Sequence, residues 1–289
     1  MKKLSFKQRK DEVHWVGDGF PVRTVFSYND LGAELSPFLL LDYAGPVNFP
    51  PSEHRRGVGD HPHRGFETVT VVYQGEVEHR DSSGGGGIIR SGEVQWMTAG
   101  SGIVHQEYHG GEFAKRGGPF EMVQLWVNLP AKDKMTPPGY QAIVNSEIPQ
   151  VDLPSEAGSL RVIAGSYNGV NGPARTRTPM NVWDVGLNAN QRAVFEVTAG
   201  DTAAVLILKG RASVADGEAV GEASLAVLER DGEQFSICAV EDTTMLILSG
   251  QPIDEPIVGY GPFVMNTSSE IAQAVADFNS GRMGRIAAS

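Results

Sequence analysis

Cysteine and long hydrophobic runs are scarce in this sequence, and each scarcity excludes a class of protein. One cysteine, Cys238, occurs in 289 residues, so no disulfide can form within the chain. No hydrophobic run reaches the roughly 18 residues that a membrane-spanning helix needs, and no apolar segment follows the N-terminal lysines, as it would in a signal peptide. We therefore expect a protein of the reducing cytoplasm with no membrane partner.

Positive charge is also scarce. The 24 Lys and Arg residues stand against 35 Asp and Glu residues, which gives a net charge of −11. The first ten residues are locally basic, but no contiguous basic stripe follows them, and nucleic-acid-binding surfaces normally show one. We therefore expect no direct nucleic-acid partner.

Glycine and proline are plentiful, with 35 and 17 residues spread along the chain. Between them lie short apolar runs rich in β-branched residues, such as FETVTVVYQG, EMVQLWVNLP, AAVLILKG and TTMLILSG. Runs of about four to eight such residues bounded by glycine are typical of strands. The pattern predicts a mainly β protein.

The two halves of the chain resemble each other. The segment TVTVVYQGEVEHRD, Thr68 to Asp81, aligns with AAVLILKGRASVAD, Ala203 to Asp216, with a glycine in register. Such self-similarity predicts a duplicated domain. The proline- and glycine-rich segment Lys132 to Gln141 is a plausible junction, so we expect one domain over residues 1–140 and a second over residues 141–289.

One helix is predicted, near residues 268–280. Thr267 is positioned to cap it, with Glu270 three residues later, and Gly281 to end it. Apolar residues recur at the helical spacing i, i+3, i+4 and i+7, which predicts that one face docks on a barrel. These residues are Ile271, Ala274, Val275 and Phe278.

Histidine is confined to the first half of the chain, and none follows His109. His61 and His63 are two residues apart, as are His105 and Glu107, and residues at that spacing share one face of a strand. Imidazole nitrogens and a carboxylate oxygen suit iron, nickel, copper, manganese or zinc. The pattern predicts a metal site in the first domain, with open coordination positions for chemistry, and none in the second.

The other histidines carry a different interpretation. His14, His54 and His79 are interpreted as ordinary surface or core residues, because a single histidine is seldom a ligand. His109 lies beside Gly110 and Gly111, which predicts a loop position.

The histidine segments also resemble a known family. The spacing in the first half resembles the two motifs of cupin barrels, and the residues concerned are His61, His63, Glu67, Gly92, Gly100 and His105. More closely, four segments that together span most of the chain resemble the pirin family: HPHRGFETVTVVYQGEVEHRDS, GEVQWMTAGSGIVHQE, QLWVNLPAKDKM and GPFVMNTSSEI. The resemblance implies an all-β bicupin, with two face-to-face β-barrel (jelly-roll) domains, a short C-terminal helix and metal in the N-terminal barrel alone.

The two patterns imply different carboxylate ligands. The pirin pattern implies ligation by His61, His63, His105 and Glu107. A general cupin would use Glu67 instead, and both glutamates have inward-compatible spacing on regular strands. The closer resemblance favours Glu107 and leaves Glu67 to orient a ligand histidine.

The resemblance further implies quercetin 2,3-dioxygenase activity, in which O2 opens a flavonol ring and carbon monoxide is released. The implied cofactor is one divalent transition metal per chain, iron first, with nickel, copper, manganese, cobalt or zinc as alternatives. Glu107 would take the proton of the flavonol hydroxyl. The partners would be a small flavonol-like aromatic substrate and O2.

Two other functions remain open from the sequence. The first is a non-catalytic iron-binding regulatory protein that modulates a transcription factor or a metabolic enzyme, which would require a protein partner. The second is a cupin isomerase of sugars, which would require basic residues in the barrel to hold a phosphate. Arg64 and Arg80 are the candidates for that role.

Overall fold

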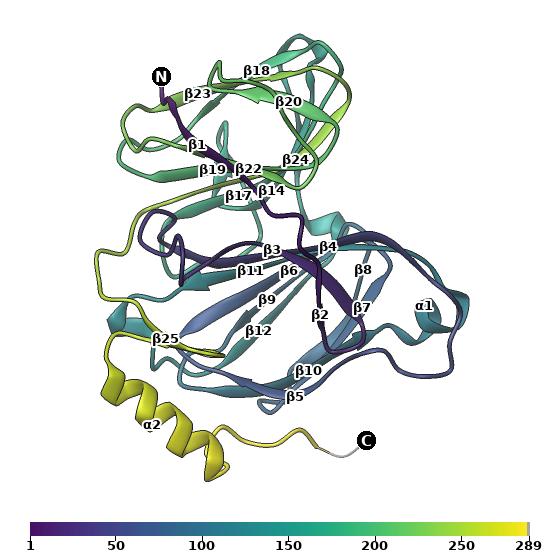
Figure 1. The fold of residues 1–289 in the computed structure, drawn as a ribbon, viewed down its shortest axis with the longest axis vertical. Helices are drawn as coiled ribbons and strands as arrows, with labels where there is room; N and C mark the ends of the chain where they lie inside the picture. Colours follow the sequence, from purple (N-terminus) through teal and green to yellow (C-terminus); the bar gives the residue numbers. More distant parts are fainter. Residues whose placement is uncertain (288–289) are drawn as a thin grey trace. The chain divides into compact units, whose positions relative to one another are not determined.

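The computed structural model describes residues 1–287, which divide into two compact units. The first barrel unit comprises Glu12–Ala33, Phe38–Asn145 and the described part of Ile253–Ser289. The second barrel unit comprises Met1–Asp11, Glu34–Pro37 and Ser146–Pro252. Antiparallel strands joined by short connections dominate both units, which confirms the expected all-β class (Figure 1).

The first barrel unit contains a seven-stranded and a four-stranded sheet. Its strands are β2 (His14–Val16), β3 (Phe20–Ser27), β4 (Phe38–Phe49), β5 (Gly57–His63), β6 (Phe66–Gln74), β7 (Glu76–Asp81), β8 (Gly86–Arg90), β9 (Val94–Thr98), β10 (Ile103–His109), β11 (Gly118–Asn128), β12 (Gly139–Ile143), β25 (Val258–Tyr260) and β26 (Phe263–Met265). The larger sheet has the order β12-β9-β6-β11-β4-β3-β2 and the smaller β5-β10-β7-β8, while β25 and β26 form a separate pair.

The second barrel unit repeats this plan. Its strands are β1 (Leu4–Arg9), β13 (Gln150–Asp152), β14 (Gly158–Ala164), β15 (Ser166–Tyr167), β16 (Val170–Asn171), β17 (Met180–Leu187), β18 (Arg192–Glu196), β19 (Thr202–Lys209), β20 (Arg211–Val214), β21 (Val220–Gly221), β22 (Ser224–Leu228), β23 (Gln234–Ala239) and β24 (Thr243–Gly250). The sheet orders are β1-β22-β19-β24-β17-β14-β13 and β18-β23-β20-β21, with β15 and β16 as a separate pair.

The seven-stranded and four-stranded sheets of the two units correspond strand by strand. The turn from β6 to β7 and the turn from β19 to β20 each contain a glycine with positive φ, +90° at Gly75 and +82° at Gly210. A side chain at either position would be strained, because L residues rarely adopt this conformation. The repeat seen in the sequence is therefore a repeat of sheet topology with the same glycine turn.

The terminal segments do not follow the expected division into residues 1–140 and 141–289. The N-terminal segment belongs to the second barrel unit, and the C-terminal segment belongs to the first. Strand β1 pairs with β22 and so belongs to the second barrel unit. Residues 253–287 belong to the first barrel unit. Hydrogen bonding at a sheet edge and packing of an apolar helix face decide these placements, and neither depends on proximity in sequence.

Two α-helices occur within residues 1–287, the predicted one and one that the sequence analysis missed. Helix α2 (Ser268–Asn279) begins after Thr267, whose Oγ1 accepts a hydrogen bond from the Glu270 amide at 3.3 Å, as predicted. The missed helix is α1 (Gly111–Arg116), which is too short to show a helical period. Short 3-10 segments lie at Ala131–Asp133, Asn145–Glu147 and Pro154–Glu156.

The buried face of α2 differs from the prediction at one position. Ile271 and Ala274 are buried, but Phe278 is 37% exposed. The buried position belongs to Asp277, whose carboxylate lies 2.9 Å from the Arg64 guanidinium, itself buried. A buried cation needs a counter-ion, and this requirement sets the face that α2 presents to the first barrel unit.

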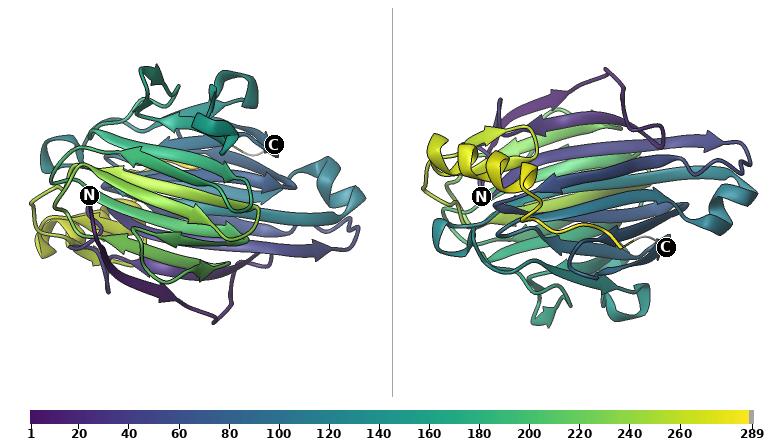
Figure 2. Two further views of the ribbon diagram at one scale, coloured as in Figure 1. Left: turned by 90° about the horizontal axis from the view of Figure 1, so that it is seen from above. Right: turned by 90° about the horizontal axis from the view of Figure 1, so that it is seen from below.

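The segment after α2 runs beside the four-stranded sheet of the same unit (Figure 2). The Ser82 hydroxyl donates a hydrogen bond to the Met283 carbonyl at 2.7 Å, and Met283 packs in an apolar cluster with Val104 of β10. Among the described residues, no helix has the length and apolar character needed to cross a membrane.

Aromatic rings fill the interior of the second barrel unit. Phe195 and Phe235 stack with their centroids 5.6 Å apart, and Trp183 lies in the same buried cluster. Central strand β19 is apolar along both faces, as expected of a strand covered on each side. The interior of the second barrel unit is therefore filled by packed apolar side chains.

Truncating that core should be costly. We expect Phe235→Ala to lower the free energy of unfolding of the second barrel unit by about 3–5 kcal/mol, because a buried phenylalanine leaves a cavity. Denaturant titration followed by tryptophan fluorescence measures the change. Val194→Ala is the control, since Val194 on β18 is 45% exposed and its loss should change stability by less than about 0.5 kcal/mol. Equal effects of the two substitutions would contradict the packed core.

Candidate metal centre

Strands β5 and β10 bring three of the predicted histidines together. The two strands are antiparallel neighbours in which His61 pairs with His105, and His63 pairs with Ile103. His61 and His63 share a face by their spacing, so both side chains lie beside that of His105. This convergence was expected from two pairs of residues on adjacent strands.

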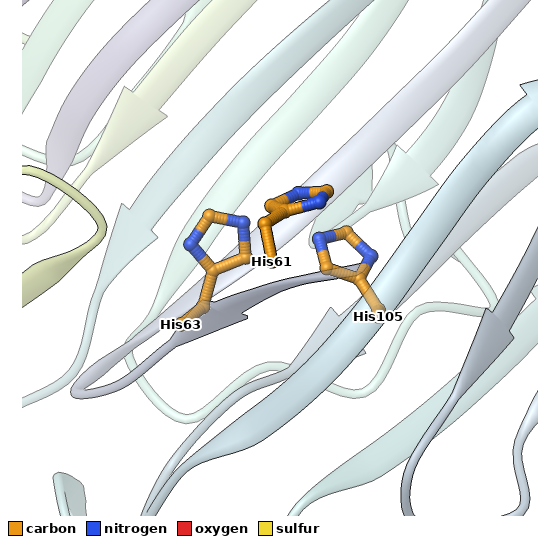
Figure 3. A group of neighbouring side chains, drawn as sticks. All are labelled: His61, His63 and His105. Atoms are coloured by element: carbon orange, nitrogen blue, oxygen red, sulfur yellow. The ribbon is translucent and has the colours of Figure 1, made fainter. Parts of the chain in front are cut away.

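The three imidazole rings lie close to one another (Figure 3). Their centroids are 4.1 Å apart for His61 and His105, 4.9 Å for His63 and His105, and 5.0 Å for His61 and His63. One nitrogen from each ring lies within 4.8 Å of the others. His63 and His105 are buried and His61 is half-buried, so His61 is the ligand candidate nearest to solvent.

Each ring has its Nδ1 atom engaged by another group. His61 Nδ1 lies 2.8 Å from the Gly59 carbonyl oxygen and His63 Nδ1 lies 3.4 Å from that of Pro262. His105 Nδ1 lies 3.2 Å from His79 Nδ1. Metal-ligating histidines usually bond through one ring nitrogen while the other is held in this way.

One atom of the group is conspicuous because it lacks a partner. His105 Nε2 is buried and has no hydrogen-bond partner among the described residues. A buried polar atom without a partner costs free energy and calls for an explanation. A metal ion bound at Nε2 would satisfy it, so the residues present fit the cofactor that the sequence implies.

Burial also sets the charge of the group. Desolvation lowers the pKa of His63 and of His105 well below the usual range, and the neighbouring His61 lowers both further. Neutral imidazole is the form that binds metal, because the nitrogen lone pair must be free. His63 and His105 therefore present neutral nitrogen ligands.

Glu107 lies near these three histidines but belongs to a second group of possible metal ligands. Its carboxylate is grouped with His79 and His105, all three residues being buried, and not with His61 and His63. The structure thus places three of the four predicted ligands together. Glu107 joins them only through the shared His105.

Two glutamine amides hold the Glu107 carboxylate. Gln95 Nε2 donates to one oxygen at 2.5 Å and Gln124 Nε2 to the other at 3.0 Å. Tyr140 donates its hydroxyl to Gln95 Oε1 at 3.3 Å, which turns the Gln95 amide nitrogen toward Glu107. Burial raises the pKa of Tyr140, with Glu107 and Asp81 adding to the effect, so the phenol stays protonated as a donor.

Glu67, the alternative carboxylate, lies elsewhere in the same barrel. It is buried on β6 and accepts a hydrogen bond from Thr98 Oγ1 at 2.6 Å. Among the described residues it is in neither group able to hold a metal. Of the two glutamates, Glu107 is the one grouped with a histidine of the convergent three.

His79 is the residue that the sequence analysis missed. It is fully buried on β7, and its Nε2 lies 3.0 Å from Asp81 Oδ2. Burial alone would raise the pKa of Asp81, but hydrogen bonds from His79 and Ser83 outweigh it and lower the pKa to about 2. The spacing of His79 and Asp81 on one strand face was the available signal.

The other three histidines lie away from the centre. His14 is exposed on edge strand β2, and exposed His54 pairs with Asp18 at 2.6 Å. His109 was expected in a loop, but it ends β10, is buried and has its Nε2 2.9 Å from the Gly19 carbonyl oxygen. Among the described residues, none of the three belongs to a group able to hold a metal.

The second barrel unit carries apolar residues at the matching positions. Where His61 pairs with His105 across β5 and β10, Phe195 pairs with Phe235 across β18 and β23. Where His79 pairs with Glu107, Val214 pairs with Ile237. All four replacements are buried in the core of that unit, so it lacks ligands at these positions.

Comparison with known proteins adds independent information. Residues 19–127 match the family model Pirin, and residues 182–284 match the model described as Pirin C-terminal cupin domain. A Pseudomonas aeruginosa protein named "Putative quercetin 2,3-dioxygenase" is 59% identical over 272 residues, which cover 94% of this chain and 95% of that protein.

Solved structures are similar over nearly the whole chain. Quercetin 2,3-dioxygenase from Acinetobacter baumannii is 55% identical with a TM-score of 0.97, covering 99% of this chain and 100% of that one. The bacterial pirin YhhW from Escherichia coli, solved in complex with nickel(II), is 22% identical with a TM-score of 0.64, covering 86% of this chain and 99% of that one. The second likeness shows the shared fold alone.

Proposed function

This chain belongs to the pirin family, and we propose that it is a metal-dependent dioxygenase that opens a flavonol ring, such as that of quercetin, with O2 and releases carbon monoxide. The observation that carries the proposal is the convergence of His61, His63 and His105, with His105 Nε2 buried and without a partner. The names of the most similar relatives support a flavonol as the substrate class.

In this proposal His61, His63 and His105 hold one divalent metal through nitrogen, and Glu107 supplies the carboxylate ligand. A mixed nitrogen and oxygen donor set suits iron, and equally nickel, copper, manganese, cobalt or zinc. The apolar residues at the matching positions of the second barrel unit support one metal per chain.

The side chains around the centre would bind the substrate and move its proton. A metal held by these ligands would lower the pKa of a coordinated flavonol hydroxyl. The Glu107 carboxylate would accept that proton while Gln95 and Gln124 hold it in place. Beside His63 the rings of Phe66 and Trp126 stack with centroids 4.3 Å apart and give the centre an apolar aromatic side.

The proposal is tested with protein loaded with a single metal and incubated with quercetin. We expect oxygen uptake equimolar with the loss of flavonol absorbance, together with release of carbon monoxide. Metal-free protein is the control. Protein that holds metal and leaves quercetin unchanged would contradict the activity and favour the non-catalytic regulatory function.

The isomerase alternative finds no support at the candidate phosphate ligands. Arg64 donates to the Ser101 carbonyl oxygen at 2.7 Å and forms an ion pair with Asp277. Arg80 Nε is 3.3 Å from Glu78 Oε1, and its side chain is partly exposed. Both guanidinium groups are therefore engaged away from the convergent histidines.

A further inference from the structure

His79 lies between a carboxylate and one of the proposed metal ligands. Its Nε2 is 3.0 Å from Asp81 Oδ2, and its Nδ1 is 3.2 Å from His105 Nδ1. All three side chains are buried. The three form a continuous chain of hydrogen bonds that ends at the imidazole whose Nε2 has no partner.

The direction of this chain follows from counting protons. Asp81 Oδ1 already accepts hydrogen bonds from Ser83 N, Ser83 Oγ and Gly85 N, and a carboxylate only accepts. The proton between Asp81 and His79 therefore lies on His79 Nε2. When this is the single ring proton of His79, its Nδ1 accepts, and the proton between the two histidines lies on His105 Nδ1.

We propose that His79 and Asp81 are positioning residues that hold His105 in the Nδ1–H tautomer and so present its Nε2 lone pair to the metal. The inference rests on the metal centre proposed above. Free imidazole populates both tautomers, and the wrong one would place a hydrogen where the metal must bind. A buried acceptor at His79 Nδ1 removes that alternative.

The fold itself does not require a histidine at this position. Val214 takes the matching place in the second barrel unit, where the same strand and glycine turn form without ligand histidines. In the first barrel unit the Tyr140 ring stacks on His79, with centroids 4.8 Å apart and planes 14° apart, and so fixes its orientation. Of the two matching positions, only the one in the unit with the proposed metal ligands holds a histidine.

Two substitutions distinguish the effect of the Nδ1 acceptor of His79 from the effect of its aromatic ring. His79→Phe keeps a flat ring under Tyr140 but removes the acceptor, and we expect it to weaken binding of nickel(II) and of iron(II) by about 10–100-fold. His79→Asn restores an acceptor oxygen near the position of Nδ1, so it should recover most of the affinity. Anaerobic titration against a chromophoric chelator measures both dissociation constants.

His109→Phe is the matched control, because it removes another buried histidine of the same barrel that is surrounded by Phe20, Phe49 and Phe120. Its metal affinity should equal that of the wild type. Equal affinity of His79→Phe and wild type, with all variants folded, would overturn the inference.

Nitrogen-15 NMR of the metal-free wild type tests the tautomer directly and requires no variant. Long-range proton–nitrogen correlations should identify His105 as Nδ1–H and His79 as Nε2–H. An Nε2–H tautomer at His105 would overturn the inference. Failure of the proposed function gives a separate result: wild type that binds metal but leaves flavonols intact loses the dioxygenase assignment, while the role of His79 is judged by affinity and tautomer.

Discussion

Replacing Glu107 by glutamine should lower flavonol turnover by on the order of 10²–10⁴-fold, because an amide cannot accept the substrate proton and loss of a general base typically costs this much. Metal retention should fall only modestly, since an amide oxygen can still coordinate. The measurement is oxygen uptake with quercetin at matched metal occupancy, which separates loss of the base from loss of the metal.

Glu67→Gln is the matched comparison. Glu67 is a buried carboxylate of the same barrel that accepts a hydrogen bond from Thr98 and stands outside both candidate groups. We expect the milder loss typical of residues that support a site indirectly, about 10–100-fold. An almost inactive Glu67→Gln variant beside a nearly unchanged Glu107→Gln variant would reverse the assignment.

Replacing His105 by alanine should abolish tight metal binding, because it removes the ligand that both candidate groups share. Metal analysis should give about one equivalent per chain for the wild type and almost none for this variant. His14→Ala is the control, since His14 is exposed on an edge strand away from the centre. The single equivalent follows from the apolar positions of the second barrel unit.

Two tightly bound equivalents, or one that survives both His105→Ala and His61→Ala, would contradict this result. The second barrel unit would then have to hold metal at a place other than the matching strands. Phe195 and Phe235 exclude the matching place, because their rings are buried against each other there.

The sequence predicted the parts of the site that depend on spacing along one strand. The pair His61 and His63 and the single His105 converge because alternate residues share a face. The role of His79 was missed because its contact with His105 depends on β7 lying next to β10, and sheet order is not encoded in either strand alone. The pairing of β1 with β22 was missed for the same reason, because the neighbours of a strand in a sheet cannot be read from that strand alone.

Strand spacing alone did not separate Glu67 from Glu107, and the choice of Glu107 came from the family resemblance and stays a prediction. Both have inward-compatible spacing, so strand periodicity treats them alike, and the surrounding donors decide where each carboxylate lies. Thr98 binds one, while Gln95 and Gln124 bind the other. In α2, likewise, an ion pair with Arg64 buries Asp277 in place of the more hydrophobic Phe278.

The exchange of terminal segments has a consequence for synthesis of the chain on the ribosome. The second barrel unit has all its parts once Pro252 has emerged, whereas the first barrel unit still needs β25, β26 and α2. Domains generally fold as units as they emerge. Most of the first barrel unit, which contains the histidines, is therefore synthesised before most of the second. It is nevertheless completed later, because its last helix, α2, is made only after the second unit has all its strands.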